Sequence, residues 1–392
     1  MAERPVVAPA HVEVTQVPDS EQFLAGMARK KLLAANPCVI AITGSVGKTS
    51  TRNAIATVLR GRFDVLSTTG NLNTVLGISL TLLNGKFDRE TKVVLEMGAC
   101  RPGDIAGLCG YFPPKVAVVT NVCGVHLETF GTIEGVARTK SEIVRALGAD
   151  GTACLNGDDP RVRAMESLNA GQTVRYGTGA HCDVVPGLIT QDIPLLGDHV
   201  IYLVLAAFAA GYTQGMPRDE INERLAMMRP EKGRLSRLEG ICGCTLIDDS
   251  YNASPVAMRT ALGVLQRQPA DRRIAYLGDM LELGEASLAE HKKVLRDAVG
   301  VADIIVVVGK HMAAARASLP DADQRAIVVF ASSTEAADAL RAGDPVSPGE
   351  GDAVLVKGSQ GMRMEHVSRV LLHDSIAPES VLCRQTESWR QI

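Results

Sequence analysis

Eight consecutive residues, Thr43-Gly-Ser-Val-Gly-Lys-Thr-Ser50, have the composition of a phosphate-binding loop. Glycines let a backbone wrap around a phosphate, and the first turn of a following helix supplies unpaired N–H groups. Lys48 would reach the β and γ phosphates of a nucleotide, and the Thr49 hydroxyl would bind Mg²⁺. The first glycine of the usual G-x-x-x-x-G-K-[ST] pattern falls on Ile42. The apolar run before the loop and the helical spacing after it still favour nucleotide binding over a chance glycine-rich turn.

Polar residues also mark the ends of two predicted strands. Glu96 ends one, Asn121 ends the next, and His126 follows in the loop beyond. Because ligands of open α/β sheets bind at the carboxyl ends of the strands, we expect Glu96 and His126 to meet Lys48 and Thr49 around a triphosphate and Mg²⁺. Considered singly, Glu96 is better explained as a helix cap or a salt-bridged surface carboxylate, and His126 as a hydrogen-bonded loop histidine. Their combination with the phosphate loop favours the shared site.

A second polar loop occurs later in the chain, in Thr245-Leu-Ile-Asp-Asp-Ser-Tyr-Asn-Ala-Ser-Pro255. It follows a predicted strand, so the same rule predicts that it faces a ligand. The competing interpretation is a helix cap before Pro255 by Asp249, Ser250 or Ser254, and we expect at least one of these residues to cap the helix. Arg234 lies upstream in a polar segment, and Lys357-Gly-Ser-Gln-Gly-Met-Arg363 forms another glycine-bearing turn at a strand end.

The elements that must position these residues alternate between strands and helices, which predicts an α/β fold with mostly parallel sheets. We predict strands at Cys38–Thr43, Lys92–Glu96, Val116–Asn121, Thr152–Leu155, Cys244–Asp248, Arg273–Leu277, Asp303–Val308, Ala326–Phe330 and Ala353–Lys357. We predict helices at Ser20–Ala35, Thr49–Arg60, Ile133–Leu147, Asp219–Met228, Pro255–Gln266, Ala286–Val299 and Ser333–Leu340.

The polar, turn-rich segment around Arg234 predicts a linker near residue 236 between two α/β domains. The predicted organisation is an N-terminal arm and helix over residues 1–36, a central domain over 37–236 and a C-terminal domain over 237–392. Residues 177–196, rich in Gly, Pro and Asp, predict a loop or a small irregular sheet.

Composition narrows the class of protein. The 41 Lys and Arg residues against 44 Asp and Glu residues give a net charge of −3, which argues against a nucleic-acid-coating protein. The longest apolar run, Val200 to Ala210, is shorter than the roughly 20 residues of a membrane span. The first ten residues lack the apolar core of a secretory signal, so we expect a cytoplasmic protein. The nine scattered cysteines contain no C-x-x-C pair, which argues against a disulfide framework or a structural zinc site.

Together these segments resemble the Mur ligase family, and within it the branch that adds D-alanyl-D-alanine. The resemblance covers residues from about 37 to 372, and its motifs occur in the family's order. They are ITGSVGKTS (42–50), GNLNTVLGISLTLL (70–83), VVLEMGA (93–99), VVTNVCGVHLETFGTIEGVARTKSEI (118–143), LNGDDP (155–160), KGRL (232–235), LIDDSYNASP (246–255), YLGDMLELGE (276–285) and LVKGSQGMRME (355–365).

The resemblance implies a P-loop-type central ATPase domain and a Rossmann-like C-terminal domain. It also implies an ATP-dependent ligase, which activates a carboxylate as an acyl phosphate and lets an amine attack it. Two Mg²⁺ ions would neutralise the charge where carboxylate meets triphosphate. The implied phosphate-binding residues are Gly44, Ser45, Gly47, Lys48 and Thr49; the implied Mg²⁺ ligands are Thr49, Glu96, His126 and a carbamylated Lys140; the implied nucleotide or domain-closing contacts are Asn73, Arg234, Asp249 and Asn252.

Lys140 has this role only by resemblance, because its position on a predicted helix by itself indicates a solvated lysine.

The sequence also departs from the family. Only about 36 residues precede the first strand, so the domain that grips the UDP end of the cell-wall precursor is not expected. Val200 and Leu203 replace a pair of asparagines near the adenine, and Thr74, Ser254 and Gln360 replace further family residues.

Three functions remain open. The first is an ATP-dependent ligase that joins a non-UDP carboxylate to an amine in a specialised pathway, favoured because the metal and phosphate set is intact while substrate contacts have changed. The second is a compact enzyme that still adds D-Ala-D-Ala, with a partner chain supplying the missing UDP contacts. The third is a nucleotide-binding regulator or scaffold without catalysis, which retention of Lys48, Thr49, Glu96, His126 and Lys140 disfavours.

Overall fold

The computed structural model describes residues 4, 14–124, 127–320, 327–343 and 346–390. These residues form two compact units. The first comprises the described residues up to Ile193 together with Ile201–Met228, and the second comprises Pro194–Val200 and the described residues from Arg229 onward. Within the described residues, no helix is both long and apolar enough to cross a membrane.

The first unit is built on a six-stranded parallel sheet. Its strand order is β2 (Val65–Ser67), β3 (Lys92–Glu96), β1 (Cys38–Thr43), β4 (Val116–Val119), β5 (Thr152–Asn156) and β6 (Gln172–Tyr176). Apolar side chains of β1, β3 and β4 are buried, as expected for strands covered on both faces.

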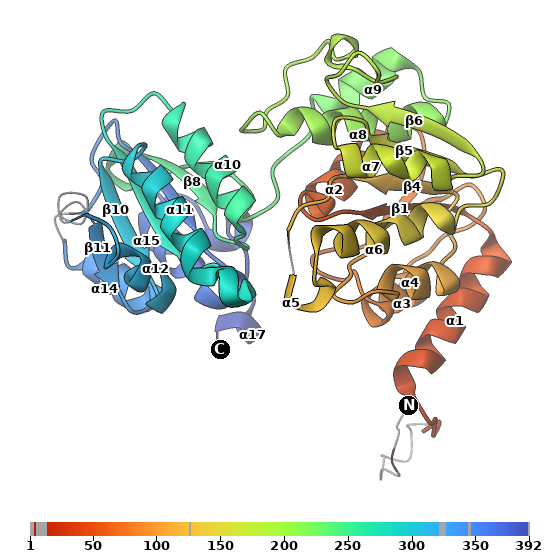
Figure 1. The fold of residues 1–392 in the computed structure, drawn as a ribbon, viewed down its shortest axis with the longest axis horizontal. Helices are drawn as coiled ribbons and strands as arrows, with labels where there is room; N and C mark the ends of the chain where they lie inside the picture. Colours follow the sequence, from red (N-terminus) through yellow and green to blue (C-terminus); the bar gives the residue numbers. More distant parts are fainter. Residues whose placement is uncertain (1–3, 5–13, 125–126, 321–326, 344–345, 391–392) are drawn as a thin grey trace. The chain divides into compact units, whose positions relative to one another are not determined.

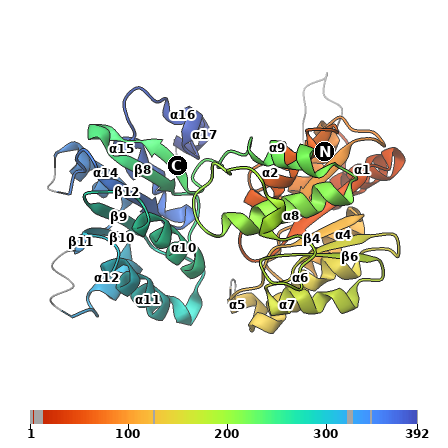
Figure 2. The ribbon, with the colours of Figure 1, turned by 90° about the horizontal axis from the view of Figure 1, so that it is seen from above.

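Helices cover both faces of this sheet (Figures 1 and 2). One face packs against α1 (Ser20–Ala35), α3 (Val75–Asn84), α4 (Asp104–Tyr111) and α6 (Ile133–Arg145). The other face carries α2 (Lys48–Leu59), α8 (Val200–Thr213) and α9 (Arg218–Leu225). Two short helices, α5 (Leu127–Phe130) and α7 (Pro160–Arg163), and two 3₁₀ turns, η1 (Ala164–Leu168) and η2 (Pro186–Leu188), complete the unit.

The second unit contains a separate six-stranded sheet with one antiparallel edge strand. Its order is β11 (Ile327–Phe330), β10 (Ile304–Val308), β9 (Arg273–Gly278), β12 (Ala353–Lys357), β8 (Thr245–Asp249) and β7 (Ser236–Glu239). One face packs against α10 (Pro255–Gln266), α11 (Ser287–Val299) and α12 (Lys310–Arg316). The other packs against α14 (Ser333–Arg341) and α15 (Glu365–Leu371). The remaining short helices are η3 (Ile241–Gly243), η4 (Gly284–Ala286), η5 (Gln360–Met362), α16 (Pro378–Val381) and α17 (Glu387–Arg390).

The predicted α/β fold with mostly parallel sheets is confirmed, and β1, β3, β12, α1 and α10 have the predicted bounds. The two units separate after Met228, before the linker predicted near residue 236. The reason is that the intervening segment packs on the second unit. The N–H of Leu235 donates to Asp249 Oδ1 at 3.2 Å, and Ser236 begins the edge strand β7. The sequence analysis missed that strand, as it missed β2 and β6.

Candidate nucleotide-binding and catalytic site

The predicted phosphate loop joins β1 to α2 in the first unit. Gly47 caps α2 in the left-handed region, with φ of 82°. Gly44 has φ of 147°, and a Cβ at this position would lie 1.9 Å from Thr120 Oγ1. Both glycines are therefore required by the backbone path. The loop leaves the first N–H groups of α2 at its mouth, which is the geometry that binds phosphate oxygens.

Hydrogen bonds fix this loop to the segment that follows β4. The N–H of Ser45 donates to the carbonyl of Asn121 at 2.9 Å, and Ser45 Oγ accepts from the N–H of Cys123 at 3.0 Å. The N–H of Val46 donates to Asn121 Oδ1 at 3.0 Å. The predicted strand ended at Asn121, whereas β4 ends at Val119, so Asn121 lies in the following segment and positions the phosphate loop.

Lys48 and Thr49 are the first two residues of α2. The Lys48 ammonium donates to the carbonyls of Gly44 and Ser45 at 2.9 and 3.1 Å, so its charge is held over the loop. A lysine in this position adds positive charge where the helix terminus already favours an anion. The arrangement can bind the phosphates of a nucleotide, as the sequence predicts.

Glu96, at the end of β3, is buried with only 2% of its surface exposed. Its Oε1 accepts from Asn73 Nδ2 at 2.9 Å, and its Oε2 lies 3.4 Å from Arg52 Nη1. The N–H of Glu96 donates to Thr68 Oγ1 at 3.0 Å. The structure therefore brings together Glu96 and Asn73, two predicted site residues, and adds Arg52, which the sequence analysis missed.

Arg52 lies one helical turn after Lys48 on α2, and it is 1% exposed. Its spacing of four residues from Lys48 places it on the same side of α2, but that spacing does not identify Glu96 as its partner. Because Glu96 is already paired with Arg52, its negative charge is stabilised in the first unit without a metal. Its predicted role as a Mg²⁺ ligand stays a prediction.

Lys140 lies on α6 and is 2% exposed, not solvated as its helical position alone indicated. It follows Val136 by four residues and precedes Ile143 by three, so it faces the same buried side of the helix as both. Burial, with a smaller contribution from the positive charge of Lys48, lowers the pKa of Lys140 to about 7. The Lys140 Nζ lies 5.9 Å from the centre of the Phe130 ring. A substantial fraction of this amine is therefore neutral near pH 7.

His126, the remaining predicted metal ligand, lies outside the described residues.

The polar loop of the second unit is held by a buried lysine. Lys357 Nζ lies 2.7 Å from Asp249 Oδ2 and donates to the carbonyl of Asn252 at 2.7 Å. The side-chain oxygen of Asn252 accepts from the N–H of Ala253 at 2.9 Å and from that of Gln360 at 3.3 Å. Asp249 and Asn252, both predicted to contact nucleotide, thus share Lys357 as a partner.

Arg234, the fourth residue of this predicted set, stacks on an aromatic ring. Its guanidinium carbon lies 4.2 Å from the centre of the Tyr251 ring. Its Nε is buried and has no hydrogen-bond partner among the described residues. A second arginine holds the same loop: Arg384 donates to the backbone carbonyls of Ser250 and Tyr251 at 2.7 and 3.0 Å. A stacked arginine with an unused buried N–H is suited to receive an anion.

Two departures from the family pattern have a local explanation. Thr74 caps α3 by accepting from the N–H of Gly77 at 3.3 Å, and Ser254 caps α10 by accepting from that of Ala257 at 3.4 Å. Threonine and serine replace asparagine well at such positions. Leu203, in contrast, packs near the phosphate loop, because its Cδ2 would lie 3.6 Å from a Cβ on Gly47.

We expect Gly44→Ala to lower nucleotide affinity by at least about tenfold, and to lower the free energy of unfolding by about 1–3 kcal/mol. The new Cβ would meet Thr120 Oγ1 at 1.9 Å, and the alanine would have to adopt a φ of 147°, which L-residues rarely do. The measurements are calorimetric titration with ADP and urea denaturation. Gly26→Ala on α1 is the control, because no atom lies within 4 Å of its Cβ. The control should gain about 0.5–1 kcal/mol with unchanged ADP binding. Equal ADP affinity in Gly44→Ala would show that the loop does not need this glycine.

Comparison with known proteins identifies the family of both units. A model of the Mur ligase middle domain matches residues 42–211, and a model of the Mur ligase, glutamate ligase domain, matches residues 233–360. The UDP-N-acetylmuramoyl-tripeptide–D-alanyl-D-alanine ligase of Mycobacterium leprae is 33% identical, over 90% of this chain and 76% of that protein. The enzyme of the same name from Bacillus subtilis is 31% identical, over 94% of this chain and 83% of its own length.

Solved structures show the same relationship. MurF from Acinetobacter baumannii superposes with a TM-score of 0.80 at 28% identity, covering 94% of this chain and 83% of that chain. MurF ligase from Thermotoga maritima, solved in complex with ADP, superposes with a TM-score of 0.78 at 30% identity, covering 94% and 86%. Since both domain models match in order and relatives align over at least 90% of its length, the chain belongs to the Mur ligase family.

Proposed function

We propose that this chain joins D-alanyl-D-alanine to the tripeptide carboxylate of a UDP-N-acetylmuramoyl-tripeptide, with cleavage of ATP to ADP and phosphate. Members of the Mur ligase family are ATP-dependent ligases that form peptide bonds and use Mg²⁺. The observation that carries the substrate assignment is the similarity to D-alanyl-D-alanine-adding relatives over at least 90% of the chain. The sequence analysis favoured a non-UDP substrate and kept this reaction as its alternative; the comparisons favour the alternative.

In this proposal the first unit binds the phosphates. The N–H groups of the Gly44–Gly47 loop and the Lys48 ammonium would neutralise the charge that develops as the γ-phosphoryl group moves to the substrate carboxylate. The Thr49 hydroxyl, Glu96 and His126 would hold Mg²⁺, which supplies charge neutralisation when bound. The oxygen atoms of Thr49 and Glu96 suit Mg²⁺, because this ion prefers oxygen ligands.

Lys140 would also help to hold Mg²⁺ once its amine is carbamylated. Its neutral amine nitrogen attacks carbon dioxide, an N–C bond forms, and a proton leaves to solvent. The product carries a carboxylate-like negative charge where the lysine had none, and would help hold a second Mg²⁺. Burial supports this role, since it lowers the pKa of Lys140 to about 7 and leaves the nucleophilic form populated.

The second unit would contact the nucleotide through Arg234, Asp249 and Asn252. Arg234 carries the strongest support among these three, because its buried Nε has no partner among the described residues. Asp249 and Asn252 would act by holding Lys357 and the loop around it.

The test is product formation from Mg-ATP, UDP-N-acetylmuramoyl-tripeptide and D-Ala-D-Ala, followed by mass spectrometry and by release of phosphate. We expect one phosphate per product, and a product mass equal to the two substrates less one water. Omission of D-Ala-D-Ala is the control and should abolish the product. A folded, ADP-binding protein that forms no product would refute the substrate assignment. Turnover of another carboxylate would then restore the non-UDP reading, and the absence of turnover with every carboxylate would favour the non-catalytic regulator.

A further inference from the structure

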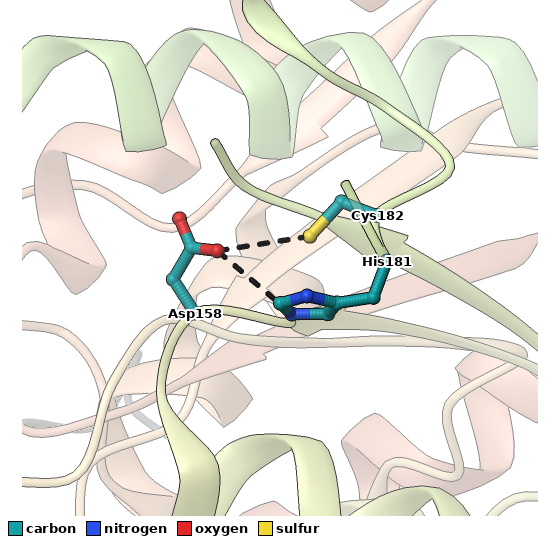
Figure 3. A group of neighbouring side chains, drawn as sticks. All are labelled: Asp158, His181 and Cys182. Carbon is teal, nitrogen blue, oxygen red and sulfur yellow. Dashed lines mark hydrogen bonds and ion pairs between the residues drawn. The ribbon is translucent and has the colours of Figure 1, made fainter. Parts of the chain in front are cut away.

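Three side chains of different chemistry meet on the first unit, away from the phosphate loop's own residues (Figure 3). Asp158 lies in the turn after β5, and His181 and Cys182 lie in the segment after β6. One ligand-type atom of each lies within 4.8 Å of the others. Asp158 Oδ1 is 3.9 Å from His181 Nε2 and 3.9 Å from Cys182 Sγ. Oxygen, nitrogen and sulfur donors therefore converge on one point from two separate segments.

The carboxylate of Asp158 is held in a fixed orientation by its neighbours. Its Oδ2 accepts from the N–H and the hydroxyl of Thr178 at 2.6 and 2.7 Å, and from the Tyr202 hydroxyl at 3.1 Å. Its Oδ1 accepts from the N–H of Gly179 at 3.0 Å and from the Cys182 thiol at 3.9 Å, a contact that a metal would replace once the thiol proton is lost. Such outer contacts orient the ligands of metal sites.

Glycines make room for the cluster. A Cβ on Gly157 would lie 2.6 Å from Cys182 Sγ and 3.3 Å from His181 Nε2. A Cβ on Gly177 would lie 2.8 Å from the carboxyl carbon of Asp158. The backbone thus approaches the three side chains more closely than any other residue type would allow.

We propose that Asp158 Oδ1, His181 Nε2 and Cys182 Sγ bind a divalent transition metal of the zinc class. This mixture of donors matches Zn²⁺, whereas Mg²⁺ and Ca²⁺ prefer oxygen ligands alone. In a tetrahedral zinc site neighbouring ligand atoms are about 3.4 Å apart, as the bond lengths require. The two 3.9 Å separations from Asp158 Oδ1 would need to close by about 0.5 Å. The His181 and Cys182 donor atoms, which lie within 4.8 Å of each other, would need to close by at most about 1.4 Å.

The fourth position has two sources of an oxygen ligand. The carbonyl of Gly157 lies 2.8 Å from His181 Nε2, and the His181 side chain is 40% exposed, so water has access. Arg163 Nη1 also lies 3.2 Å from His181 Nε2. Arg163 is exposed and would turn into solvent when a cation binds. Binding would release the Cys182 thiol proton to solvent and leave the imidazole proton on Nδ1.

A metal here would add to the hydrogen bonds that already join the turns after β5 and β6. Asp158 already receives the hydroxyl of Tyr202 from α8, and the next residue, Leu203, packs near Gly47 of the phosphate loop. The metal would therefore fix the start of α8 against the turns after β5 and β6. Its role is structural, and it is independent of the substrate assignment made above.

The experiment uses Co²⁺ as a spectroscopic probe on the full chain after treatment with a chelator. We expect one Co²⁺ per chain, with a thiolate-to-cobalt charge-transfer band in the near ultraviolet. The band should disappear in Cys182→Ser, and Co²⁺ affinity should fall by at least about tenfold in His181→Gln. Cys242→Ser, which removes an exposed thiol outside the cluster, is the control and should keep the band.

Zinc should displace the cobalt, remove the band and raise the Tm of the wild-type chain but not of Cys182→Ser. A wild-type chain without a charge-transfer band, or a band that persists in Cys182→Ser, would overturn the proposal. Loss of product formation in the ligase test leaves this result unaffected, since the cobalt band reports on Cys182 alone.

Discussion

Lys48→Ala should lower the rate of product formation by about 10²–10³-fold, because it removes the only predicted phosphate-binding cation of the loop. The Lys48 ammonium is held by the carbonyls of Gly44 and Ser45 at the start of α2. A fixed positive charge stabilises a migrating phosphoryl group more in the transition state than in the bound nucleotide. We therefore expect the larger change in kcat and a smaller change in KM for ATP.

The assay is steady-state ADP release coupled to mass detection of the ligated product. Lys30→Ala is the matched control, since Lys30 is an exposed lysine on α1 in the same unit, and it should retain the wild-type rate. Urea denaturation of Lys48→Ala should give nearly the wild-type midpoint, which separates lost chemistry from lost folding. Wild-type turnover in a folded Lys48→Ala chain would exclude the proposed phosphate role.

The strands at the centre of each sheet were predictable because their composition is unambiguous. Cys38–Thr43 and Ala353–Lys357 are almost wholly apolar and end at polar, turn-forming residues, which is typical of parallel strands covered on both faces. The missed strands lie at sheet edges. The three residues of β2 are all half-buried, and β7 reads Ser-Arg-Leu-Glu, so neither carries a continuous apolar run. Only the pairing with a neighbouring strand defines them.

The candidate site was predictable where one local motif carries it. The glycines and Lys48 of the phosphate loop follow one another in the chain, and the structure gives them the expected backbone. Partners that come from other segments were not predictable in this way. Nothing local to Arg52 indicates that it pairs with Glu96, which is 44 residues away in sequence.

The cluster of Asp158, His181 and Cys182 shows the same limit more strongly. The cysteine spacing argued against a structural zinc site, because zinc motifs are usually recognised from pairs of cysteines close in sequence. Here the donors differ in type and are brought together by the packing of two turns, with Cys182 24 residues after Asp158. A rule based on the spacing of cysteines in the sequence cannot detect such a site. The distances between side chains in the structure reveal it.

Replacement of Lys140 should separate catalysis from stability. Lys140→Met and Lys140→Arg should both lower product formation by about 100-fold, since neither side chain can be carbamylated. If the lysine acted only as a cation, Lys140→Arg would keep much of the activity. The assay is the initial rate in buffer with and without added bicarbonate, and only the wild-type enzyme should respond to bicarbonate.

The stability of the two variants should differ, although both lose activity. Burial lowers the pKa of Lys140 from 10.5 to about 7, so between these pH values the unfolded chain binds one more proton at this residue than the folded chain does. The free energy of unfolding of the wild-type chain should therefore rise with pH across this window, by up to about 1.4 kcal/mol per pH unit. Below pH 7 the lysine is charged in both states, and its burial cost is fully present.

Lys140→Met removes this cost, so in buffer depleted of carbon dioxide it should be more stable than wild type at pH 7.5, and the difference should shrink by pH 9.5. Urea denaturation at both pH values measures the effect, because the linear extrapolation gives the free energy of unfolding directly. Lys140→Arg keeps a buried charge and should be less stable than Lys140→Met at both. If both variants are inactive and Lys140→Met is the more stable of the two, the lysine is retained for its chemistry. Its burial then lowers the free energy of unfolding of the wild-type chain. A Lys140→Met chain less stable than wild type at pH 7.5 would instead give the buried amine a structural role.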